Sequence, residues 1–256
     1  MQASWLGYLN TTGLQSIDYR ISDRYADPPG SSEHLYSEQL MRLPHSQWCY
    51  RPVYQVPLPA NREDDGAPVV FGCFNQFAKI SDVCLTLWCE ILKQVPDSRL
   101  RVISVPGKSA ENAFRSSVES HGLDPRRLEM APRIGIHEYF AAIGNVDVAL
   151  DTFPYNGATT TLDTLWMGVP IVSLPGNTAV ARSSFSILSS LAAQELIATS
   201  SADLIARNVA LATNGDWRRT LRQSLRSRLE SSTLMDAHGF TRGLEEGFRT
   251  MWRDGL

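Results

Sequence analysis

Short apolar runs alternate with helical patterns through the middle of the chain, and this alternation constrains the fold more than any other feature. The apolar runs have the length and composition of buried strands and lie at residues 69–75, 99–105, 127–131, 146–150 and 170–174. A helical pattern with Ser81 as its cap and Pro96 as its stop separates the first two runs. Strands that alternate with helices predict a parallel sheet covered on both faces. We therefore expect a Rossmann-like α/β fold at residues 66–200.

The sequence on either side of this region has a different character. Residues 1–60 are rich in turns, and within them we expect a short strand at 17–23 and a short helix at 34–43. Residues 56–68 hold three prolines, a glycine and a cluster of charges, which is typical of a linker. The end of the chain has helical periodicity. The expected organisation is an incomplete unit at 1–60, an α/β lobe at 61–200 and a helical tail at 201–256 that packs on them.

The composition is that of an ordinary soluble protein. With 43% hydrophobic and 20% charged residues the chain can bury a sizeable core, and a net charge of −3 gives no reason to expect nucleic acid as a partner. No apolar run is long enough to cross a bilayer, and the amino end lacks the features of a secretion signal. We therefore expect no membrane partner and a cytoplasmic location. The four cysteines lack metal-binding spacing and are expected to be free thiols.

The turn and helix after the fourth strand form the best candidate for a ligand site. Asn156 and Gly157 lie in the turn, and three threonines from Thr159 onward then begin an amphipathic helix. We expect the threonines to cap this helix, whose unpaired N–H groups make a ready site for phosphate. Asp163, expected in the first turn of the helix, is suited to accept hydrogen bonds from a ribose. In parallel sheets of this kind ligands bind beyond the carboxyl ends of the strands, which is where these residues fall.

These residues also carry a family resemblance. The stretch LDTFPYNGATTTLDTLWMGVP, followed by PGNTAVAR, resembles the donor-binding core of the O-GlcNAc transferase family, in particular its bacterial and SPINDLY-like members. The resemblance continues through FGCFNQFAKIS, WLGYLNTTGLQSIDYRISDRYADPPG and YSEQLMRLP, and so covers most of residues 4–200. It implies the donor-binding lobe of a GT-B glycosyltransferase, which transfers GlcNAc from UDP-GlcNAc to a Ser/Thr hydroxyl of a protein with inversion.

The resemblance assigns four residues to the diphosphate of the donor. Gln76 and Lys79 follow the first strand, and Thr159 and Thr160 begin the helix after the fourth strand. Lys79 is the implied catalytic residue, because it would stabilise the charge that develops on the leaving diphosphate. No metal or other cofactor is expected, since the sequence has no DxD-like pair. The alternatives are that the threonines are only helix caps and that Lys79 is a solvated charge, although one cap is enough for a helix and a cation at a helix amino end opposes the dipole.

The resemblance assigns a second group of residues to the rest of the donor. Ala131 and Arg133 follow the third strand, where the family holds uracil by main-chain groups and a basic side chain. Asp163 is assigned to the ribose hydroxyls, and Arg182 is expected to reach the donor site. The alternatives are an ordinary surface arginine at 133 and an arginine that pairs with a helix end at 182.

Two departures from the family leave the activity open. Ala158 and Tyr139 stand where the animal enzymes have histidines, so the identity of the donor sugar is uncertain. The chain is also expected to begin near the end of the first lobe, so it would lack that lobe's catalytic histidine and the repeat domain. A separate amino-terminal lobe and a separate repeat domain are possible partners. The expected function is therefore the donor-binding part of the transferase. The alternatives are a non-catalytic UDP or UDP-sugar-binding module, a transferase of another hexose, and an α/β interaction domain with an inactive site.

Overall fold

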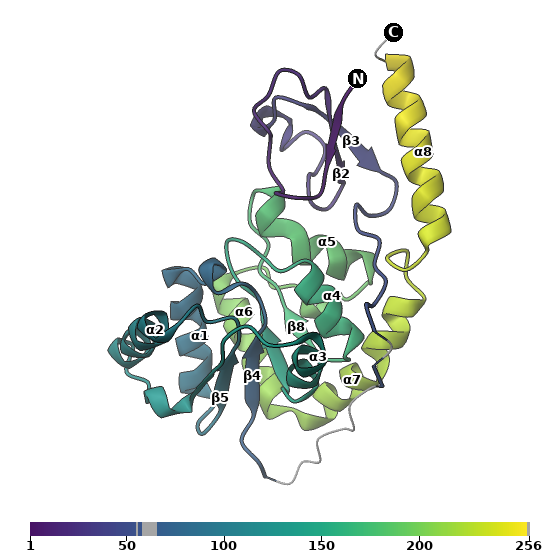
Figure 1. Ribbon diagram of the computed structural model, residues 1–256. Coiled ribbons are helices and arrows are strands. Elements are labelled where there is room, and N and C mark those ends of the chain that lie inside the picture. Colours follow the sequence, from purple (N-terminus) through teal and green to yellow (C-terminus); the bar gives the residue numbers. More distant parts are fainter. Residues whose placement is uncertain (55, 58–65, 255–256) are drawn as a thin grey trace.

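The larger of two packed units is built on a five-stranded parallel sheet (Figure 1). The computed structural model describes residues 1–54, 56–57 and 66–254. The strand order is β6–β5–β4–β7–β8, and the strands are β4 (Val70–Cys73), β5 (Arg99–Val102), β6 (Leu128–Met130), β7 (Val148–Leu150) and β8 (Ile171–Val172). The parallel α/β fold expected from the sequence is confirmed. Most of the predicted linker, residues 58–65, lies outside the described residues.

Helices flank this sheet on both sides (Figure 1). They are α1 (Asp82–Gln94), α2 (Lys108–Ser120), α3 (Ile136–Gly144), α4 (Thr159–Trp166), α5 (Ser183–Ser190), α6 (Ser201–Thr213) and α7 (Gly215–Glu230). α1 packs against α6, and α4 packs against α5 and α7. Ser81 caps α1 as expected, because its hydroxyl accepts a hydrogen bond from the N–H of Cys84 at 3.1 Å. The tail of the chain is helical, as predicted.

The strand order creates a switch point at the middle of the sheet. From β4 the chain moves outward to β5 and β6, and then returns to the other side of β4 with β7 and β8. The chain therefore leaves β4 and β7 toward opposite edges of the sheet, which creates a crevice of the kind where such sheets bind ligands. Gly72 is required here, because a Cβ at this position would lie 2.8 Å from Val146 and from the ring of Phe74.

The smaller unit is a three-stranded parallel sheet made by the start of the chain. Its strands, in spatial order, are β1 (Ala3–Trp5), β2 (Tyr19–Asp23) and β3 (Gln39–Leu43). The last helix, α8 (Ala237–Asp254), returns to cover one face of it (Figure 1). Met251 of α8 packs there with Tyr19, Ile21 and Leu43 in a small separate core.

The helix predicted at residues 34–43 is wrong. Only Glu33–Leu35 form a single 3-10 turn, and Gln39–Leu43 are the strand β3. The edge of β2 offers a full ladder of backbone hydrogen bonds to this segment, and Met41 and Leu43 alternate toward α8 in the period of a strand. Tertiary pairing thus overrides a weak local preference for helix. Residues 1–54 are accordingly more regular than their turn-rich sequence suggests.

The two units are tied together by side chains as well as by the chain. Ser186 of α5 donates to the carboxylate of Asp23 at 2.7 Å, and the guanidinium of Arg182 donates to the carbonyl of Tyr25 at 2.7 Å. The ring of Phe185 meets that of Tyr25 edge to face. These contacts place the small unit over the carboxyl ends of the large sheet.

Candidate functional site

The loops after β4 and β7 meet at the switch point through a set of polar contacts. The side-chain amide of Asn75 donates to the hydroxyl of Thr152 at 3.0 Å, and Thr160 donates to the amide oxygen of Asn75. The ammonium of Lys79 donates to the carbonyl of Asn156 at 3.1 Å. Three residues predicted from the sequence, Lys79, Asn156 and Thr160, are therefore brought to one place.

Lys79 is held on two sides. Besides the carbonyl of Asn156, its ammonium lies 3.7 Å from the centre of the Tyr155 ring. Burial lowers the pKa of Lys79 from its ordinary value, and the nearby carboxylate of Asp151 acts against this shift. A half-buried cation of this kind gains from an anionic ligand, because the ligand restores the interactions that burial removed.

Asp151 organises the turn that follows β7, and sequence reasoning did not single it out. Its buried carboxylate accepts hydrogen bonds from the N–H of Thr152 at 2.9 Å, the N–H of Gly157 at 2.8 Å and the hydroxyl of Ser173 at 2.9 Å. Burial raises the pKa of Asp151, and these hydrogen bonds oppose that rise. The signal in the sequence is a carboxylate directly after a buried strand.

The start of α4 differs from the expected threonine cap. The capping position is Ala158, which makes no side-chain hydrogen bond to the helix. The hydroxyls of Thr160 and Thr161 are instead bonded to Asn75 and Ser184, because the loop packs closely around them. A Cβ on Gly157 would lie 2.5 Å from the hydroxyl oxygen of Thr161. The amino end of α4 therefore has no side-chain cap, which suits the binding of an anion.

A depression of about 330 Å³ opens at the carboxyl ends of β5 and β6 and beside the start of α4. Four predicted residues line it: Arg133, Thr159, Thr160 and Asp163. The other lining residues, most of them apolar, are Ile103, Ser104, Ile134, Ile136 and Tyr139. This volume is at the small end of the range for pockets that hold small molecules. The mixture of polar and apolar side chains around the depression suits a ligand with a charged part and a flat, weakly polar part.

Asp163 lies in the second turn of α4 and not in its first, as the sequence had suggested. The hydroxyl of Tyr50 donates to its Oδ1 at 2.8 Å, and the hydroxyl of Tyr139 donates to its Oδ2 at 3.0 Å. Burial raises the pKa of Asp163, and the two tyrosine hydroxyls oppose that rise. Neither tyrosine was predicted as a partner of Asp163. Because Tyr50 is more than 100 residues away along the chain, no local pattern could reveal it.

The remaining predicted residues lie around this centre. Gln76 is exposed after β4. The N–H of Ala131 donates to Val102 at 3.0 Å, and its carbonyl accepts from Val105 at 3.1 Å, so its main chain already takes part in strand pairing. Arg182 binds the carbonyls of Tyr25 and Gly176, at 2.7 Å and 3.1 Å, and does not line the depression.

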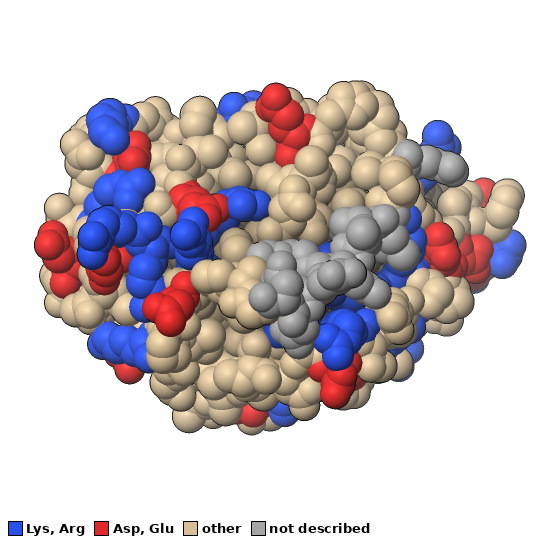
Figure 2. Space-filling view, turned by 90° about the horizontal axis from the view of Figure 1, so that it is seen from below, with Lys and Arg blue, Asp and Glu red and all other residues tan. Residues whose placement is uncertain are grey.

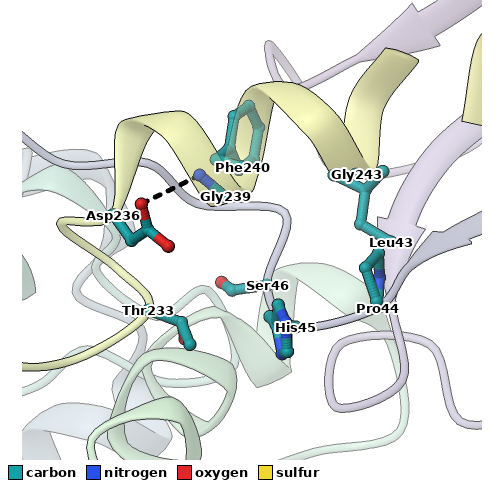
Figure 3. A pocket seen from close by; sticks show the side chains of 9 residues that line it. All are labelled: Leu43, Pro44, His45, Ser46, Thr233, Asp236, Gly239, Phe240 and Gly243. Atoms are coloured by element: carbon teal, nitrogen blue, oxygen red, sulfur yellow. Dashed lines mark hydrogen bonds between the residues drawn. The ribbon is translucent and has the colours of Figure 1, made fainter. Parts of the chain in front are cut away.

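Two other hollows are poorer candidates. One, of about 870 Å³, lies at the amino ends of the strands, where Figure 2 shows Lys and Arg gathered among Asp and Glu. This is the end opposite to the one where parallel sheets bind ligands. The other lies between β3 and the start of α8, around His45 and Asp236 (Figure 3). Its volume of about 10 Å³ has room for about one water molecule.

The part of the chain that the structure describes contains no group of three or more His, Cys, Asp or Glu side chains arranged to hold a metal ion. The four cysteines are free thiols, as predicted. Among the described helices, none has both the length and the apolar character needed to cross a membrane.

A parallel sheet of this order, with its crevice facing a second unit, is the fold of the GT-B glycosyltransferases. Two solved structures with 14% identity share it, each with a TM-score of 0.61: WaaG, a glycosyltransferase involved in lipopolysaccharide biosynthesis, and the sucrose-phosphate synthase of Thermosynechococcus elongatus. The model of glycosyl transferase family 41 matches residues 51–244, and the chain belongs to this family.

Relatives within the family are similar over nearly the whole chain. A mutant of the Thermobaculum terrenum O-GlcNAc transferase has a TM-score of 0.89 and 38% identity, over 99% of this chain and 48% of that one. SPINDLY of Solanum lycopersicum, described as a probable UDP-N-acetylglucosamine–peptide N-acetylglucosaminyltransferase, is 40% identical over 99% of this chain. The match covers 28% of that relative, so the chain spans less than a third of the length of the curated proteins that it resembles.

Proposed function

We propose that this chain is the donor-binding part of a UDP-GlcNAc-dependent protein O-glycosyltransferase that acts with inversion on Ser/Thr hydroxyls. The proposal draws on the activity described for the family relatives. The observation that carries it is the convergence of Arg133, Thr159, Thr160 and Asp163 on one depression at the carboxyl ends of the strands. A cytoplasmic location stays a prediction from the sequence.

The diphosphate is proposed to lie against the amino end of α4. Thr159 is exposed there, Gly157 brings the main chain close, and the ammonium of Lys79 is fixed next to the same turn by the carbonyl of Asn156. A helix end without a side-chain cap and a cation beside it are the two features that favour a phosphate group. Gln76 is proposed to contact the phosphates from the loop after β4.

The nucleoside is proposed to occupy the depression itself. Ile134, Ile136 and Tyr139 offer apolar surface to a uracil ring, and Arg133 lines the same depression. The carbonyl of Ala131 has a second lone pair for the base, although its first is used in strand pairing. Asp163 is proposed to accept hydrogen bonds from the ribose.

The leaving group is proposed to be stabilised without a metal ion. As the bond to the sugar breaks, negative charge grows on the diphosphate, and preorganised dipoles and cations lower the energy of that state. Lys79 and the N–H groups of α4 are fixed in the folded protein, so they need little rearrangement when the charge develops. Arg182 is proposed to act at a distance, by holding the small unit against the rim of the site.

A titration of the chain with UDP, GDP and ADP by calorimetry tests the donor class. We expect UDP to bind most tightly. Failure to bind any of the three would refute a nucleotide site, whereas tighter binding of GDP would refute the uracil assignment. Separate Arg133→Ala and Gln76→Ala variants should weaken UDP binding, and Arg126→Ala, at the opposite end of the sheet, is the matched control for the arginine.

A second candidate function is a UDP-sugar-binding module without transfer activity, and a third is transfer of a different hexose. The third candidate function is retained because Ala158 and Tyr139, which stand where the animal enzymes have histidines, lie where the donor is proposed to bind. A transfer assay with several UDP-sugars, using the chain alone and together with an amino-terminal lobe of a family member, separates the three. Product only from a donor other than UDP-GlcNAc would select the third candidate.

A further inference from the structure

The carboxylate of Asp163 is fixed between two tyrosine hydroxyls that come from separate parts of the chain. Tyr50 donates to Oδ1 at 2.8 Å, and Tyr139 donates to Oδ2 at 3.0 Å. Asp163 is only 6% exposed, yet it lines the depression. Each carboxylate oxygen accepts one hydroxyl and keeps further capacity to accept. The positions of the two hydroxyls therefore set the direction in which the remaining lone pairs point.

Tyr50 is itself rigidly placed. It belongs to the segment that leads from β3 to the large unit, and its side chain is buried in the main core. Its N–H donates at 2.7 Å to the carbonyl of Leu234, in the connection between α7 and α8. Arg226 of α7 ties the same segment to α4, because it donates to the carbonyl of Val56 at 2.9 Å and to that of Trp166 at 2.6 Å. The segment that carries Tyr50 is thus held by α7 and by the connection between α7 and α8, neither of which lines the depression.

The two tyrosines differ in what they can do to a ligand. Tyr139 is part of the wall of the depression, so its removal would change the surface that a ligand touches. Tyr50 is not among the lining residues. Since its hydroxyl donates to Asp163, we expect an effect of that hydroxyl on a bound nucleotide to pass through Asp163.

We propose that Tyr50 is a positioning residue that, by fixing Asp163, makes the nucleotide site select a ribose over a sugar without 2′ and 3′ hydroxyls. The proposal rests on the proposed function, in which Asp163 accepts hydrogen bonds from the ribose. Without the hydroxyl of Tyr50, the carboxylate keeps one anchor and gains freedom to turn about its last side-chain bond. Binding of the ribose must then also order the carboxylate, which is unfavourable in entropy, and the ribose contact weakens.

The experiment compares the dissociation constants of UDP and 2′,3′-dideoxy-UDP by calorimetry. The wild-type chain is expected to favour UDP by roughly tenfold or more, because the contact is made to a charged group. In Tyr50→Phe, which removes only the hydroxyl, this ratio should fall by roughly threefold to tenfold. Tyr19→Phe is the matched control: Tyr19 is also buried, but its hydroxyl donates to the carbonyl of Met251 in the small unit. Its ratio should equal that of the wild type.

The outcomes separate this inference from the proposed function. A wild-type chain that does not bind UDP, or does not distinguish the two ligands, overturns the ribose assignment and this inference with it. A wild-type chain that distinguishes them, with an unchanged ratio in Tyr50→Phe, overturns this inference alone. Tyr50→Leu also lacks the hydroxyl. The ratio of the two dissociation constants is measured in whichever of the two variants circular dichroism shows to be folded. In an Asp163→Asn background the Tyr50 substitution should change the ratio no further, and an additive effect would also count against the inference.

Discussion

Replacement of Lys79 by methionine is the sharpest test of the diphosphate site. Methionine keeps most of the unbranched side chain and removes the ammonium, together with its contact to the carbonyl of Asn156 and its position over the Tyr155 ring. Lys108→Met is the matched control. Lys108 is exposed at the start of α2, where it pairs with Glu111 at 3.0 Å.

The magnitude follows from the kind of contact that is lost. A hydrogen bond to a charged group contributes about 1.5–3 kcal/mol. At about 1.4 kcal/mol per factor of ten, this loss weakens UDP binding by roughly 10- to 150-fold. Lys108 lies outside the depression and its ion pair is at the surface, so its replacement should change affinity by less than about twofold.

The assay is calorimetric titration of UDP into both variants at two salt concentrations. The Lys79 variant should bind more weakly and should also show a smaller loss of affinity with added salt, since one charged contact is missing. Thermal unfolding curves of both variants establish that each is folded. Equal affinities in the two folded variants would refute the assignment of Lys79 to the diphosphate.

Four further predictions follow from the site. Gly157→Ala should lower UDP affinity at least about tenfold, because its Cβ would press on Thr161 and Thr160; Gly135→Ala, where the nearest atom is 3.7 Å away, is the control, and equal affinities would contradict the close packing. Asp151→Asn should lower the free energy of unfolding by about 1–3 kcal/mol, because Oδ1 accepts two N–H groups and Oδ2 accepts the hydroxyl of Ser173, whereas an amide can accept on only one of these two sides; an unchanged urea midpoint would refute this. UDP affinity should be constant near neutral pH and decline in alkaline solution, beginning at a lower pH than an ordinary lysine would give, because burial lowers the pKa of Lys79; a Lys79→Arg variant that binds should show no such decline. The 256-residue chain alone should transfer GlcNAc to peptides poorly or not at all, because positioning of the acceptor supplies roughly 7–11 kcal/mol of such barriers; multiple turnovers seen by mass spectrometry would overturn this.

The elements that the sequence predicted well are those whose signal is local. The β4, β5 and β7 segments are short apolar runs with clear turns after them, and Ser81 and Pro96 mark the two ends of α1. The amino end of α4 was located for the same reason, since a glycine turn and a threonine run are neighbours in sequence. Even there the chemistry differed, because the threonine hydroxyls bond to Asn75 and Ser184 and do not cap the helix.

The features that were missed depend on residues far apart in the chain. The strand β3 forms because it pairs with the edge of β2, and the sequence of residues 34–43 contains no local signal of this pairing. The hydrogen bond from Tyr50 to Asp163 spans 113 residues, and Asp151 gains its role from Gly157 and Ser173 after the turn closes. Spacing along a chain reports helices, strands and turns, whereas a binding site is completed by contacts between them.

The return of α8 to the first unit has a consequence for the order in which the molecule folds. Tyr19 and Ile21, near the start of the chain, pack with Met251, and the hydroxyl of Tyr19 reaches a carbonyl 232 residues away. During synthesis the first sheet emerges early, but its apolar face stays uncovered until residues 237–254 have been made. The paired strands of the larger unit lie closer along the chain, even between Phe71 and Val148, than Tyr19 lies to Met251, so its loops close at lower entropic cost. Of the two units, the one that is made first is therefore expected to be the last to complete its core.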